Sequence, residues 1–473
     1  MEKSHELGTA RIPVLLARFS VPAIVGMMVQ ALYNIVDRIF IGQGVGPMGI
    51  AGATIAFPLM LIQMAFSMLI GLGATSLISI NLGAKHPEKA ESVLGNAFVL
   101  LIAVAAVMSI GGFFLLDRLL RLFGASDTVL PFARAYTEVI LLGTIFQSIA
   151  MGMNNFISGE GKPRTAMATM LIGALLNTIL DPLFIFGLKL GVAGAAWATI
   201  ISQAVSSTWV LSYYLSGRSR LKIRLRNLVL NRKTVLSIMA IGSAPFAMQL
   251  GASLLNAIVN NQLTAYGGDL AVSAMGIVFS VSMLFFMPIF GINQGAQPII
   301  GYNYGARNYG RMMHTVQIAA GAATAIMIVG FAVIQLAPRI MVSLFAGSAK
   351  ELSDLAVHAI RIYFLMMPLI GFQIVAAGYF QAVGKPRQAM FLSLSRQIIV
   401  LIPLFLILPR FFGLDGIWFA PPVSDLISAL LTGTFFYREW RSFRKGEPPA
   451  SPSAAEPAAA IDGRASTSRV DVQ

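Results

Sequence analysis

Long apolar runs separated by short polar turns dominate the pattern along the chain. Each run holds mainly apolar residues over roughly the 20 positions that a helix needs to cross the hydrocarbon core of a bilayer. The strict period-two alternation of membrane strands is absent. The pattern therefore predicts twelve membrane-spanning helices, at residues 14–40, 51–80, 93–116, 131–156, 166–188, 192–215, 234–263, 270–302, 313–337, 352–382, 388–408 and 414–437.

The composition excludes a large soluble enzyme and a nucleic-acid-binding protein. The 473 residues are 56% hydrophobic and 11% charged, whereas a soluble chain carries about 25% charged residues. The net charge of +14 comes from Lys and Arg scattered between apolar runs, not from one contiguous basic stripe. Because the chain has no cysteine, it offers no disulfide, thiolate metal site or cysteine nucleophile.

The distribution of Lys and Arg predicts the topology. These residues gather in alternate loops, above all in 216–233, and the intervening loops carry few of them. Cationic loops stay on the cytoplasmic side of a membrane, and the N-terminus shows no cleavable signal peptide. We therefore expect a multi-pass protein of the cell inner membrane with both termini in the cytoplasm. Residues 446–473, rich in Pro, Ala and Ser, are expected to form a disordered cytoplasmic tail.

Three sequence blocks recur in the same order and at a nearly constant offset in the second half of the chain. They are NLGAK at 81–85 and NYGAR at 303–307, GKPRTAM at 161–167 and GKPRQAM at 384–390, and GVAGAAWA at 191–198 and GLDGIWFA at 413–420. The blocks fall in turns or next to them, where Gly and Pro are suited to the backbone. They indicate that the chain arose by internal duplication.

The duplication predicts the architecture. Each half holds six spans, and an even number returns the chain to the same side, so the halves share one orientation and are related by an axis along the membrane normal. The predicted fold class is an all-α integral membrane fold of two six-helix lobes in a parallel internal repeat. The N-terminal lobe covers 1–215, the basic cytoplasmic linker 216–233 and the C-terminal lobe 234–445.

Four motifs together resemble one transporter family. The first span ends in YNIVDRIFIG at 33–42, and the second runs into GLGATSLISINLGAKHPEKAE at 71–91. MNNFISGEGKPRTAM at 153–167 and NTILDPLFIFG at 177–187 follow. This combination resembles the MATE family, the multidrug and toxic compound extrusion transporters, and within it the bacterial DinF/MepA-like branch. The resemblance covers residues 12–440 and implies a V-shaped pair of lobes that exports amphipathic, often cationic compounds by proton or sodium antiport.

Ionisable residues at membrane depth are the chief functional candidates, because a charge placed in lipid costs at least about 2.5–3.5 kcal/mol. Asp181 lies in the fifth span, with Asn177 one turn earlier on the same face. Pro182 frees a backbone carbonyl nearby. Carboxylate, amide and carbonyl oxygens are the ligands that a small hard cation prefers. Thr199 in the sixth span and Asn154 or Asn155 in the fourth could add to the site.

The family resemblance implies the same cation-binding and coupling site. The residues that it indicates are Asp37, Asn154, Asn177, Asp181 and Thr199, with sodium as one possible ion at Asp37, Asn177 and Asp181.

An architectural role is the alternative for these carboxylates. Asp181 would then cap a kink, and Asp37 would pair with Arg38 at an interface. The repeat weighs against this reading, because Asp37 aligns with Asn260 and Asp181 with Ile402. The acidic pair exists in one half only, which favours a functional role.

The remaining intramembrane charges have other interpretations. Arg396 and Asp425 fall at similar depth in the eleventh and twelfth spans, so we expect a structural ion pair, with a substrate contact as the alternative. Glu138 and Arg361 occupy aligned positions of opposite charge near the outer side. They could line a vestibule or pair across the lobes.

Span 7 lacks the acidic residue that some branches of the family carry there. A second ion site of that kind is therefore not expected in the C-terminal lobe. Polar side chains take its place and are candidates for lining a substrate cavity, namely Gln249, Asn256 and Asn260.

The sequence thus predicts a cation-coupled multidrug antiporter that works by alternating access. The alternative is a lipid or glycolipid flippase of related architecture. An enzyme is not expected, because the chain has no Walker motif and no nucleophile–base or metal-ligand constellation. No cofactor is expected beyond the transported proton or sodium ion. The expected partners are small organic substrates and the lipid bilayer, with no nucleic acid, and the protein is expected to be monomeric.

Overall fold

The computed structural model describes residues 7–346 and 350–444, and every regular element in this part of the chain is a helix. Backbone groups in lipid must be hydrogen-bonded within their own segment, which favours this outcome for long apolar runs. The predicted tail at 446–473 lies outside the described residues. The N-terminal half contains α2 (Ile12–Val45), α3 (Pro47–Gly83), α4 (Pro87–Leu122), α5 (Leu130–Gly159), α6 (Pro163–Pro182), η1 (Leu183–Gly187), α7 (Gly191–Leu215) and, in the linker, η2 (Leu225–Leu228).

The C-terminal half opens on α8 (Arg232–Gly305), in which two spans meet at Gly268. Gly268 has a φ of 62°, a left-handed conformation that glycine adopts at no steric cost, so the backbone changes direction there. The half continues with α9 (Tyr309–Leu336), α10 (Pro338–Ala346), α11 (Lys350–Tyr363), α12 (Met367–Ala382), α13 (Pro386–Leu394), η3 (Ser395–Val400), α14 (Leu401–Phe412) and α15 (Leu414–Arg444).

The described helices account for the twelve predicted spans. Ten helical segments are long and apolar enough to cross a bilayer, and the pair α11 and α12, bent by 54°, supplies an eleventh. Helix α7 has 25 residues, which is sufficient length, although its Gly, Ala and Ser make it less apolar. The predicted all-α, two-lobe membrane fold is confirmed.

The duplication extends to the conformation of the turns. Gly161 and Gly384, in the two GKPR blocks, have φ angles of 93° and 73°. Lys85 and Arg307, which end the NLGAK and NYGAR blocks, have φ angles of 59° and 57°. A positive φ is uncommon in a residue that carries a side chain. Its recurrence at the same place in both halves shows that the sequence repeat is also a repeat of backbone structure.

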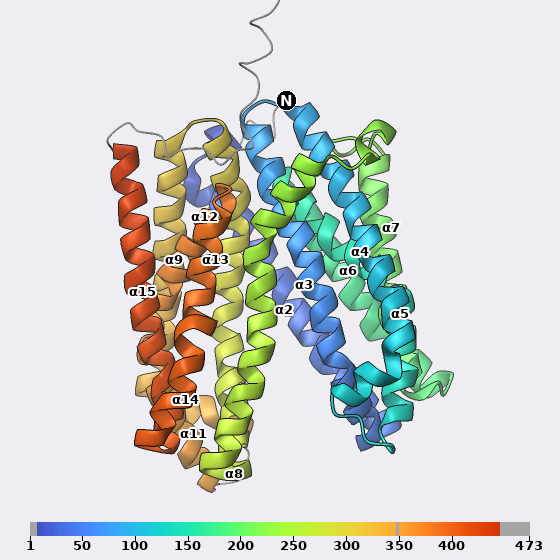
Figure 1. The fold of residues 1–473 in the computed structure, drawn as a ribbon, viewed down its shortest axis with the longest axis vertical. Coiled ribbons are helices and arrows are strands. Elements are labelled where there is room, and N and C mark those ends of the chain that lie inside the picture. The colour runs from blue at the N-terminus through green and yellow to red at the C-terminus, as the bar shows by residue number, and fades with distance from the viewer. Residues whose placement is uncertain (1–6, 347–349, 445–473) are drawn as a thin grey trace, which may run out of the picture.

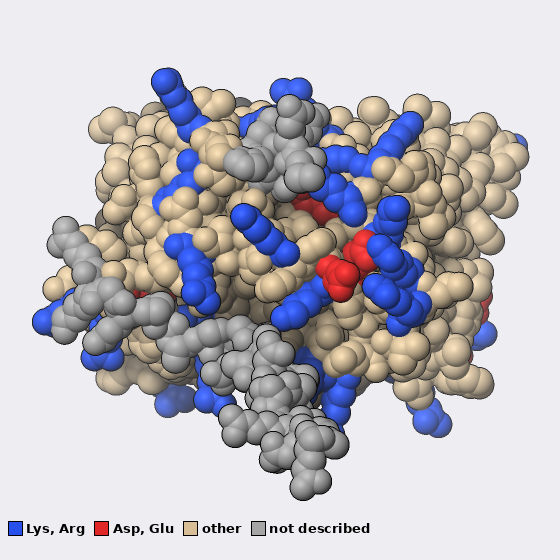
Figure 2. Space-filling model, turned by 90° about the horizontal axis from the view of Figure 1, so that it is seen from above, with Lys and Arg blue, Asp and Glu red and all other residues tan. Residues whose placement is uncertain are grey.

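Two lobes of helices meet at one end and diverge toward the other. Helices α2–α7 form one lobe and α8–α15 the other, and their ribbons separate away from the end that carries the N-terminus (Figure 1). Lys and Arg are scattered over this end, with few acidic residues among them (Figure 2). We call it the basic end and the opposite one the far end. The basic end carries the turns 84–86, 160–162, 216–231, 306–308 and 383–385.

The lobes meet through a reciprocal backbone contact between α3 and α8 at the basic end. Gly83 packs on the carbonyl oxygen of Tyr302, and Gly305 packs on the carbonyl oxygen of Ile80. Gly83 and Gly305 are equivalent positions of the repeat, and so are Ile80 and Tyr302. The contact is therefore self-complementary, as at a two-fold interface. A Cβ on either glycine would overlap a backbone oxygen, so only glycine permits this approach.

A second pair of equivalent glycines extends the interface between the lobes. Gly73 of α3 lies against the carbonyl oxygen of Ile238 in the first span of α8. Gly295, the equivalent position in the second half, lies against the backbone of Ser20 on α2. The interface therefore follows the same pseudo-symmetry as the lobes, and it involves α2 and α3 on one side and both spans of α8 on the other.

The linker between the lobes is bound to the N-terminal lobe by two buried carboxylates. Glu160, just beyond the end of α5, accepts hydrogen bonds from Ser219 at 2.7 and 2.8 Å and from Tyr213 at 3.2 Å. Glu91 of α4 forms an ion pair with Arg224 at 2.8 Å. The linker is thus a fixed part of the N-terminal lobe at the basic end.

Glu160 is expected to make stability depend on pH. Burial raises its pKa from 4.5 to about 6, although the hydrogen bonds from Ser219 and Tyr213 oppose this. Because the folded-state pKa exceeds the unfolded one, the stabilisation by protonation is fully present below pH 4.5 and is lost as the pH rises through 6. It amounts to about 2 kcal/mol. Melting curves of Glu160→Gln in detergent should lack this component, and a pH profile identical to that of the unaltered protein would contradict it.

Candidate functional site

Three helices of the N-terminal lobe bring the predicted site residues to one depth. Asp37 lies about two turns before the end of α2, and Thr199 lies about two turns after the start of α7. Asp181 on α6 lies a little under two turns before the end of η1. All three are thus about 9–12 Å from the far end of their helices. Since α2 packs against both α6 and α7, the residues can form one cluster.

Asn177 connects the buried polar groups of this cluster. Its Nδ2 donates to Asp181 Oδ1 at 3.2 Å and to Thr199 Oγ1 at 3.4 Å. Asp181 is 0% exposed, and Asn177 and Thr199 are buried as well. The carboxyl group of Asp37 lies beside that of Asp181, close enough to interact with it directly. The side chain of Arg38, the alternative partner considered for Asp37, lies outside the described residues.

The cluster is complementary to a cation. Asn177 Oδ1 and Asp181 Oδ2 are buried, and apart from the neighbouring Asp37 carboxyl group no donor among the described residues serves them. A buried acceptor without a donor costs roughly 1–3 kcal/mol, and more if it is charged. Two neighbouring carboxylates also oppose each other's ionisation unless positive charge is added. A proton shared by the carboxyl groups, or a small metal ion bound by these oxygens, would relieve both costs.

The ligand set limits how a metal ion could be held. In the described part of the chain, no group of three or more His, Cys, Asp or Glu side chains is arranged to hold a metal ion. Any ion in this cluster would therefore be bound by two carboxylates together with the neutral oxygens of Asn177, Thr199 or the backbone. Such a set of hard oxygen ligands suits a weakly bound, exchangeable cation.

Helix α6 becomes irregular directly after Asp181. Pro182 has no N–H, so the carbonyl group of Thr178 lacks its usual donor within the helix. The chain then continues as the π-helical segment η1. Such segments are rare in proteins, and those that do occur are often found at functional sites. The break that Pro182 predicted thus adjoins the buried carboxylate and leaves a backbone oxygen available near it.

Tyr33 belongs to the cluster and was not predicted. It lies within electrostatic range of both Asp37 and Asp181, and its hydroxyl accepts a hydrogen bond from Gln30 Nε2 at 3.0 Å. Tyr33 stands one turn before Asp37 on the same face of α2. This four-residue spacing within the motif YNIVDRIFIG was the signal that could have identified it.

The structure does not bring Asn154 to the cluster. Asn154 lies in the last turns of α5, at the basic end, and lines a small cavity with Pro22, Ala166 and Gln294. From Ala166, Asp181 is roughly 15 residues further along α6, or about 22 Å. Helices α5 and α6 run in opposite directions. Asn154 lies close to the turn that joins them at the basic end, whereas Asp181 lies toward the far end of α6, so the two residues are at different depths. We therefore leave it out of the proposed site.

The predicted pair between Arg396 and Asp425 is formed. Arg396 Nε lies 2.7 Å from Asp425 Oδ1, and the two side chains are 23% and 5% exposed. Ser424 donates to the carbonyl oxygen of Arg396 at 2.7 Å, and the guanidinium lies 5.5 Å from the ring centroid of Phe286. Arg396 belongs to the π-helical segment η3. The pair therefore connects α13–α14 to α15 within the C-terminal lobe.

A structural role for this pair predicts unequal effects of single and double substitutions. Asp425→Asn leaves the charge of Arg396 without its partner and should lower the free energy of unfolding by about 3–5 kcal/mol. The double variant Arg396→Met/Asp425→Leu removes both charges and should lose much less. Unfolding in mild detergent measures both. Equal losses in the two variants would argue against a structural pair.

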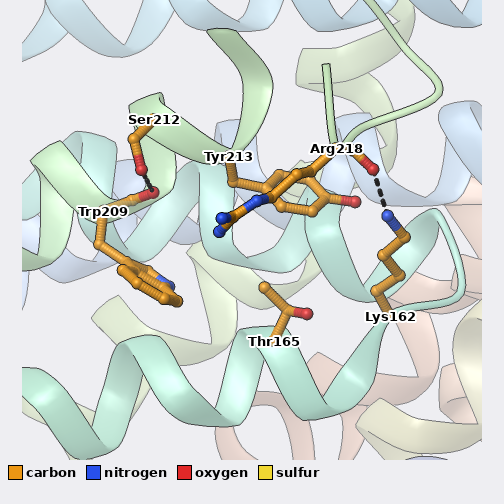
Figure 3. A pocket seen from close by; sticks show the side chains of 6 residues that line it. All are labelled: Lys162, Thr165, Trp209, Ser212, Tyr213 and Arg218. Carbon is orange, nitrogen blue, oxygen red and sulfur yellow. Dashed lines mark hydrogen bonds between the residues drawn. The ribbon is translucent and has the colours of Figure 1, made fainter. Parts of the chain in front are cut away.

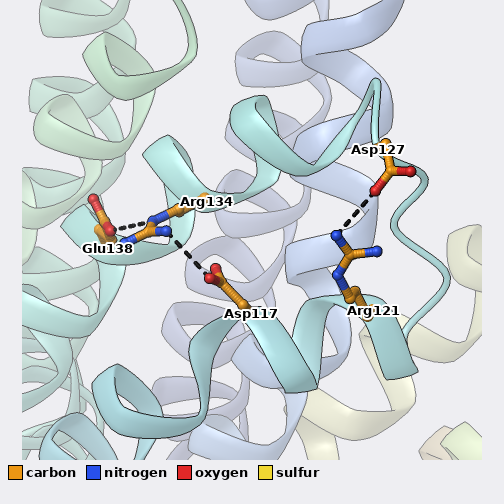
Figure 4. Close-up of polar contacts among 5 residues, drawn as sticks. All are labelled: Asp117, Arg121, Asp127, Arg134 and Glu138. Carbon is orange, nitrogen blue, oxygen red and sulfur yellow. Dashed lines mark hydrogen bonds and ion pairs between the residues drawn. The ribbon is translucent and has the colours of Figure 1, made fainter.

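The charges at the far end have partners within their own lobe. Glu138 pairs with Arg134 on α5 at 2.7 Å, and Arg134 also reaches Asp117 on α4 at 3.2 Å (Figure 4). Arg361 donates to the carbonyl oxygen of Gln335 at 3.4 Å. The pair between Glu138 and Arg361 that would join the lobes is not formed in this conformation. Glu138 instead helps to connect α4 and α5.

The polar residues expected in a substrate cavity share one face of the first span of α8. Gln249 is partly exposed, and Asn256 and Asn260 are exposed, at spacings of seven and four residues. The amide of Asn256 donates to the carbonyl oxygen of Ala252 at 2.9 Å. Their role in binding a substrate stays a prediction.

The duplicated fold agrees with a comparison of families. The sequence model of the MatE family matches residues 22–183 and 245–407, once in each lobe. The chain belongs to the MatE family. The resemblance inferred from its motifs is thereby confirmed.

Individual relatives of this MATE-family chain are multidrug transporters by name. The multidrug export protein MepA of Staphylococcus haemolyticus is 27% identical over 419 residues, which cover 89% of this chain and 92% of that protein. MepA of Staphylococcus aureus strain MRSA252 is 26% identical over the same length and the same shares of both chains. These relatives match nearly the whole of both lobes.

Solved structures of MATE transporters share the fold. The MATE multidrug transporter DinF-BH, solved in complex with a ligand, is 43% identical, with a TM-score of 0.87 over 94% of this chain and 99% of that one. A multidrug resistance MATE family transporter described as outward-facing is 26% identical, with a TM-score of 0.87 over the same shares. This MATE-family protein is therefore a multi-pass membrane protein of a multidrug-export family.

Proposed function

We propose that this MATE-family protein is a cation-coupled antiporter that exports amphipathic, often cationic organic compounds in exchange for protons or sodium ions. The observation that carries this proposal is the fully buried Asp181, bonded to Asn177 and adjoined by Asp37, with no cationic side chain among its contacts with described residues. A buried carboxylate without a fixed counter-charge is stabilised when it binds a cation, so it is suited to exchange one.

The restriction of this cluster to one lobe supports a functional role. Asp181 and Thr199 align with Ile402 and Pro421 of the C-terminal lobe. The two lobes have the same helices, so a residue needed only for architecture would be needed in both. The C-terminal lobe folds without the cluster, and a role in coupling explains the difference.

Helix α2 offers a physical connection between the cluster and the contact of the lobes. It carries Asp37 toward the far end and Ser20 at the basic end, where Ser20 meets Gly295 of the other lobe. Pro22 lies between them and weakens the helix at that point. When a cation binds or leaves, the charge beside α2 changes, and a bend at Pro22 would alter the interface. A difference in ion affinity between two such states is sufficient to drive the lobes.

We propose further that the basic end faces the cytoplasm and that the protein lies in the cell inner membrane with both termini inside. The excess of Lys and Arg at this end supports that orientation. Because the lobes meet at the basic end, the structure would correspond to an outward-facing state. The likeness to a transporter described as outward-facing supports this assignment. The proposed unit is a monomer without a resident cofactor.

The names of the relatives support this class of substrate. MepA is named a multidrug export protein, and DinF-BH is named a multidrug transporter. Export of several amphipathic compounds requires an adaptable, partly apolar surface. We propose that the stripe of Gln249, Asn256 and Asn260 supplies polar contacts within it.

Reconstituted protein tests the proposal. Proteoliposomes would receive a fluorescent organic cation under a proton gradient, a sodium gradient or neither, with labelled phospholipid added in parallel. We expect one gradient to drive accumulation of the organic cation and neither to drive lipid movement. Gradient-driven lipid movement without transport of the organic cation would overturn the antiporter proposal in favour of a flippase.

A further inference from the structure

A basic cavity lies at the basic end of the N-terminal lobe, outside the proposed cation site. Its volume is about 290 Å³. The start of α6, the end of α7 and the first part of the linker surround it (Figure 3). The residues that line it are Lys162, Thr165, Trp209, Ser212, Tyr213 and Arg218.

The groups around this cavity favour an anion. The Lys162 ammonium lies 4.9 Å from the ring centroid of Tyr213 and donates to the carbonyl oxygen of Arg218. The guanidinium of Arg218 has no ion-pair partner in the described parts of the chain. Helix α6 starts at Pro163, so its positive dipole end also faces this region. The indole Nε1 of Trp209 is a buried donor without a partner among the described residues.

The carboxylate of Glu160 is not among the groups that line the cavity. Glu160 accepts hydrogen bonds from the hydroxyl groups of Ser219 and Tyr213 and from the backbone N–H of Arg220, the last at 3.4 Å. It stabilises the linker. Two cationic side chains therefore face one small volume with no carboxylate among its lining residues.

The lysine equivalent to Lys162 is placed differently in the other lobe. Lys385, the repeat mate of Lys162, forms an ion pair with Glu439 at 2.5 Å, and Tyr379 donates to the same carboxylate at 3.0 Å. Both side chains of that ion pair are almost fully buried. The position that aligns with Glu439 in the N-terminal lobe is Gly217. The two equivalent lysines therefore differ in their surroundings: Lys385 belongs to a buried ion pair, and Lys162 lines a cavity.

The cavity lies at the level of lipid headgroups. Helix α7 has 25 residues, about 37 Å, and so extends roughly 3–4 Å beyond each side of a hydrocarbon core of about 30 Å. Ser212 and Trp209 lie about one and two turns before its end, which places them at this boundary, where Trp is enriched. Val205, one turn deeper than Trp209, is an exposed apolar side chain that an acyl chain could contact.

We propose that this cavity binds the phosphate-bearing headgroup of an anionic phospholipid. Lys162 and Arg218 contact the phosphate, Trp209 Nε1 and the Thr165 hydroxyl donate to its ester oxygens, and the acyl chains follow α7 past Val205. The volume is at the lower limit of ligand pockets, about 300 Å³, so it admits a headgroup and not a whole lipid. The proposal is independent of ion coupling, because it involves none of the cluster residues.

Quenching of Trp209 fluorescence by brominated lipid tests this site. The protein would be placed in phosphatidylcholine nanodiscs with equal small fractions of brominated phosphatidylglycerol or brominated phosphatidylcholine. Subtraction of the Trp209→Phe signal isolates the Trp209 component from the other three tryptophans. We expect stronger quenching by phosphatidylglycerol. Arg218→Gln should reduce this preference about fivefold, as expected for one cation near an anionic headgroup.

The control is Arg387→Gln, at the start of α13 in the other lobe. Arg387 is exposed and lines no described cavity, so its removal should leave the preference intact. Equal quenching by both lipids in the unaltered protein, or an undiminished preference in folded Arg218→Gln, would overturn the proposal. Inorganic phosphate at matched ionic strength should not displace the lipid. Displacement by phosphate would show a site for a soluble anion and would likewise overturn it.

Discussion

Asp181→Asn is expected to abolish gradient-driven export while the protein still folds and binds its substrate. Asparagine keeps the size and the hydrogen bond to Asn177 but cannot carry the charge that a cation neutralises. Removing a buried charge also removes its desolvation cost, so stability should not fall. In coupled sites, binding of one ligand typically changes the affinity for the other by about 5–150-fold. In Asp181→Asn the substrate affinity should no longer depend on the driving ion. Substrate affinity measured with and without the driving ion would reveal the loss.

The control for this prediction is Asp415→Asn, which removes a half-exposed carboxylate that pairs with His358 at the far end of the other lobe. It should transport normally. Asp37→Asn should behave like Asp181→Asn, and Tyr33→Phe should weaken coupling without abolishing it, because only a neighbouring hydroxyl is lost. Normal ion-driven export by folded Asp181→Asn would remove the basis of the proposed mechanism.

Gly83→Leu is expected to prevent the lobes from meeting at the basic end. A Cβ at Gly83 would overlap the carbonyl oxygen of Tyr302, and backbone cannot move aside as a side chain can. Overpacking of a tight contact costs about 1–3 kcal/mol, which is enough to make the alternative state dominant. Spin labels at Lys89 and Arg441, exposed on opposite lobes, should therefore move apart at the basic end. Transport by Gly83→Leu should fall as well.

Two variants separate this effect from a general loss of packing. Gly305→Leu should act like Gly83→Leu, because the two glycines make the same reciprocal contact. Gly310→Leu should be neutral, since a Cβ there meets nothing within 4 Å. The chain has no native cysteine, so two introduced cysteines place the labels without further substitution. An unchanged distance in folded Gly83→Leu would show that the contact does not close the basic end.

Features that depend on a single helix could be predicted from the sequence. Apolarity over about 20 residues is sufficient to place a span in lipid. The four-residue spacing of Asn177 and Asp181 put both side chains on one face, and the structure joins them. Depth along two neighbouring spans was sufficient to predict that Arg396 and Asp425 would pair. The same count, applied to Asn154, would have placed it at the opposite end from Asp181.

Features that depend on contacts between distant helices could not be predicted. The repeat showed that Gly83 and Gly305 are equivalent, but not that each packs on the other's helix, because no sequence pattern defines how two lobes meet. The contact between Glu160 and the linker could not be predicted either, because its partner Ser219 lies in a segment whose sequence has no helical or strand periodicity. Tyr33 was overlooked because a neutral tyrosine in a membrane helix is most often a packing or interface residue.

The most direct test of the account is whether binding of a substrate releases the coupling ion. Purified protein in weakly buffered detergent solution, free of sodium or supplemented with it, would be titrated with an organic cation while pH and sodium activity are recorded. Antiport predicts release of about one ion per bound substrate, because the two ligands favour opposite states, and no release from Asp181→Asn. Saturating substrate binding to the unaltered protein without release of either ion would contradict it.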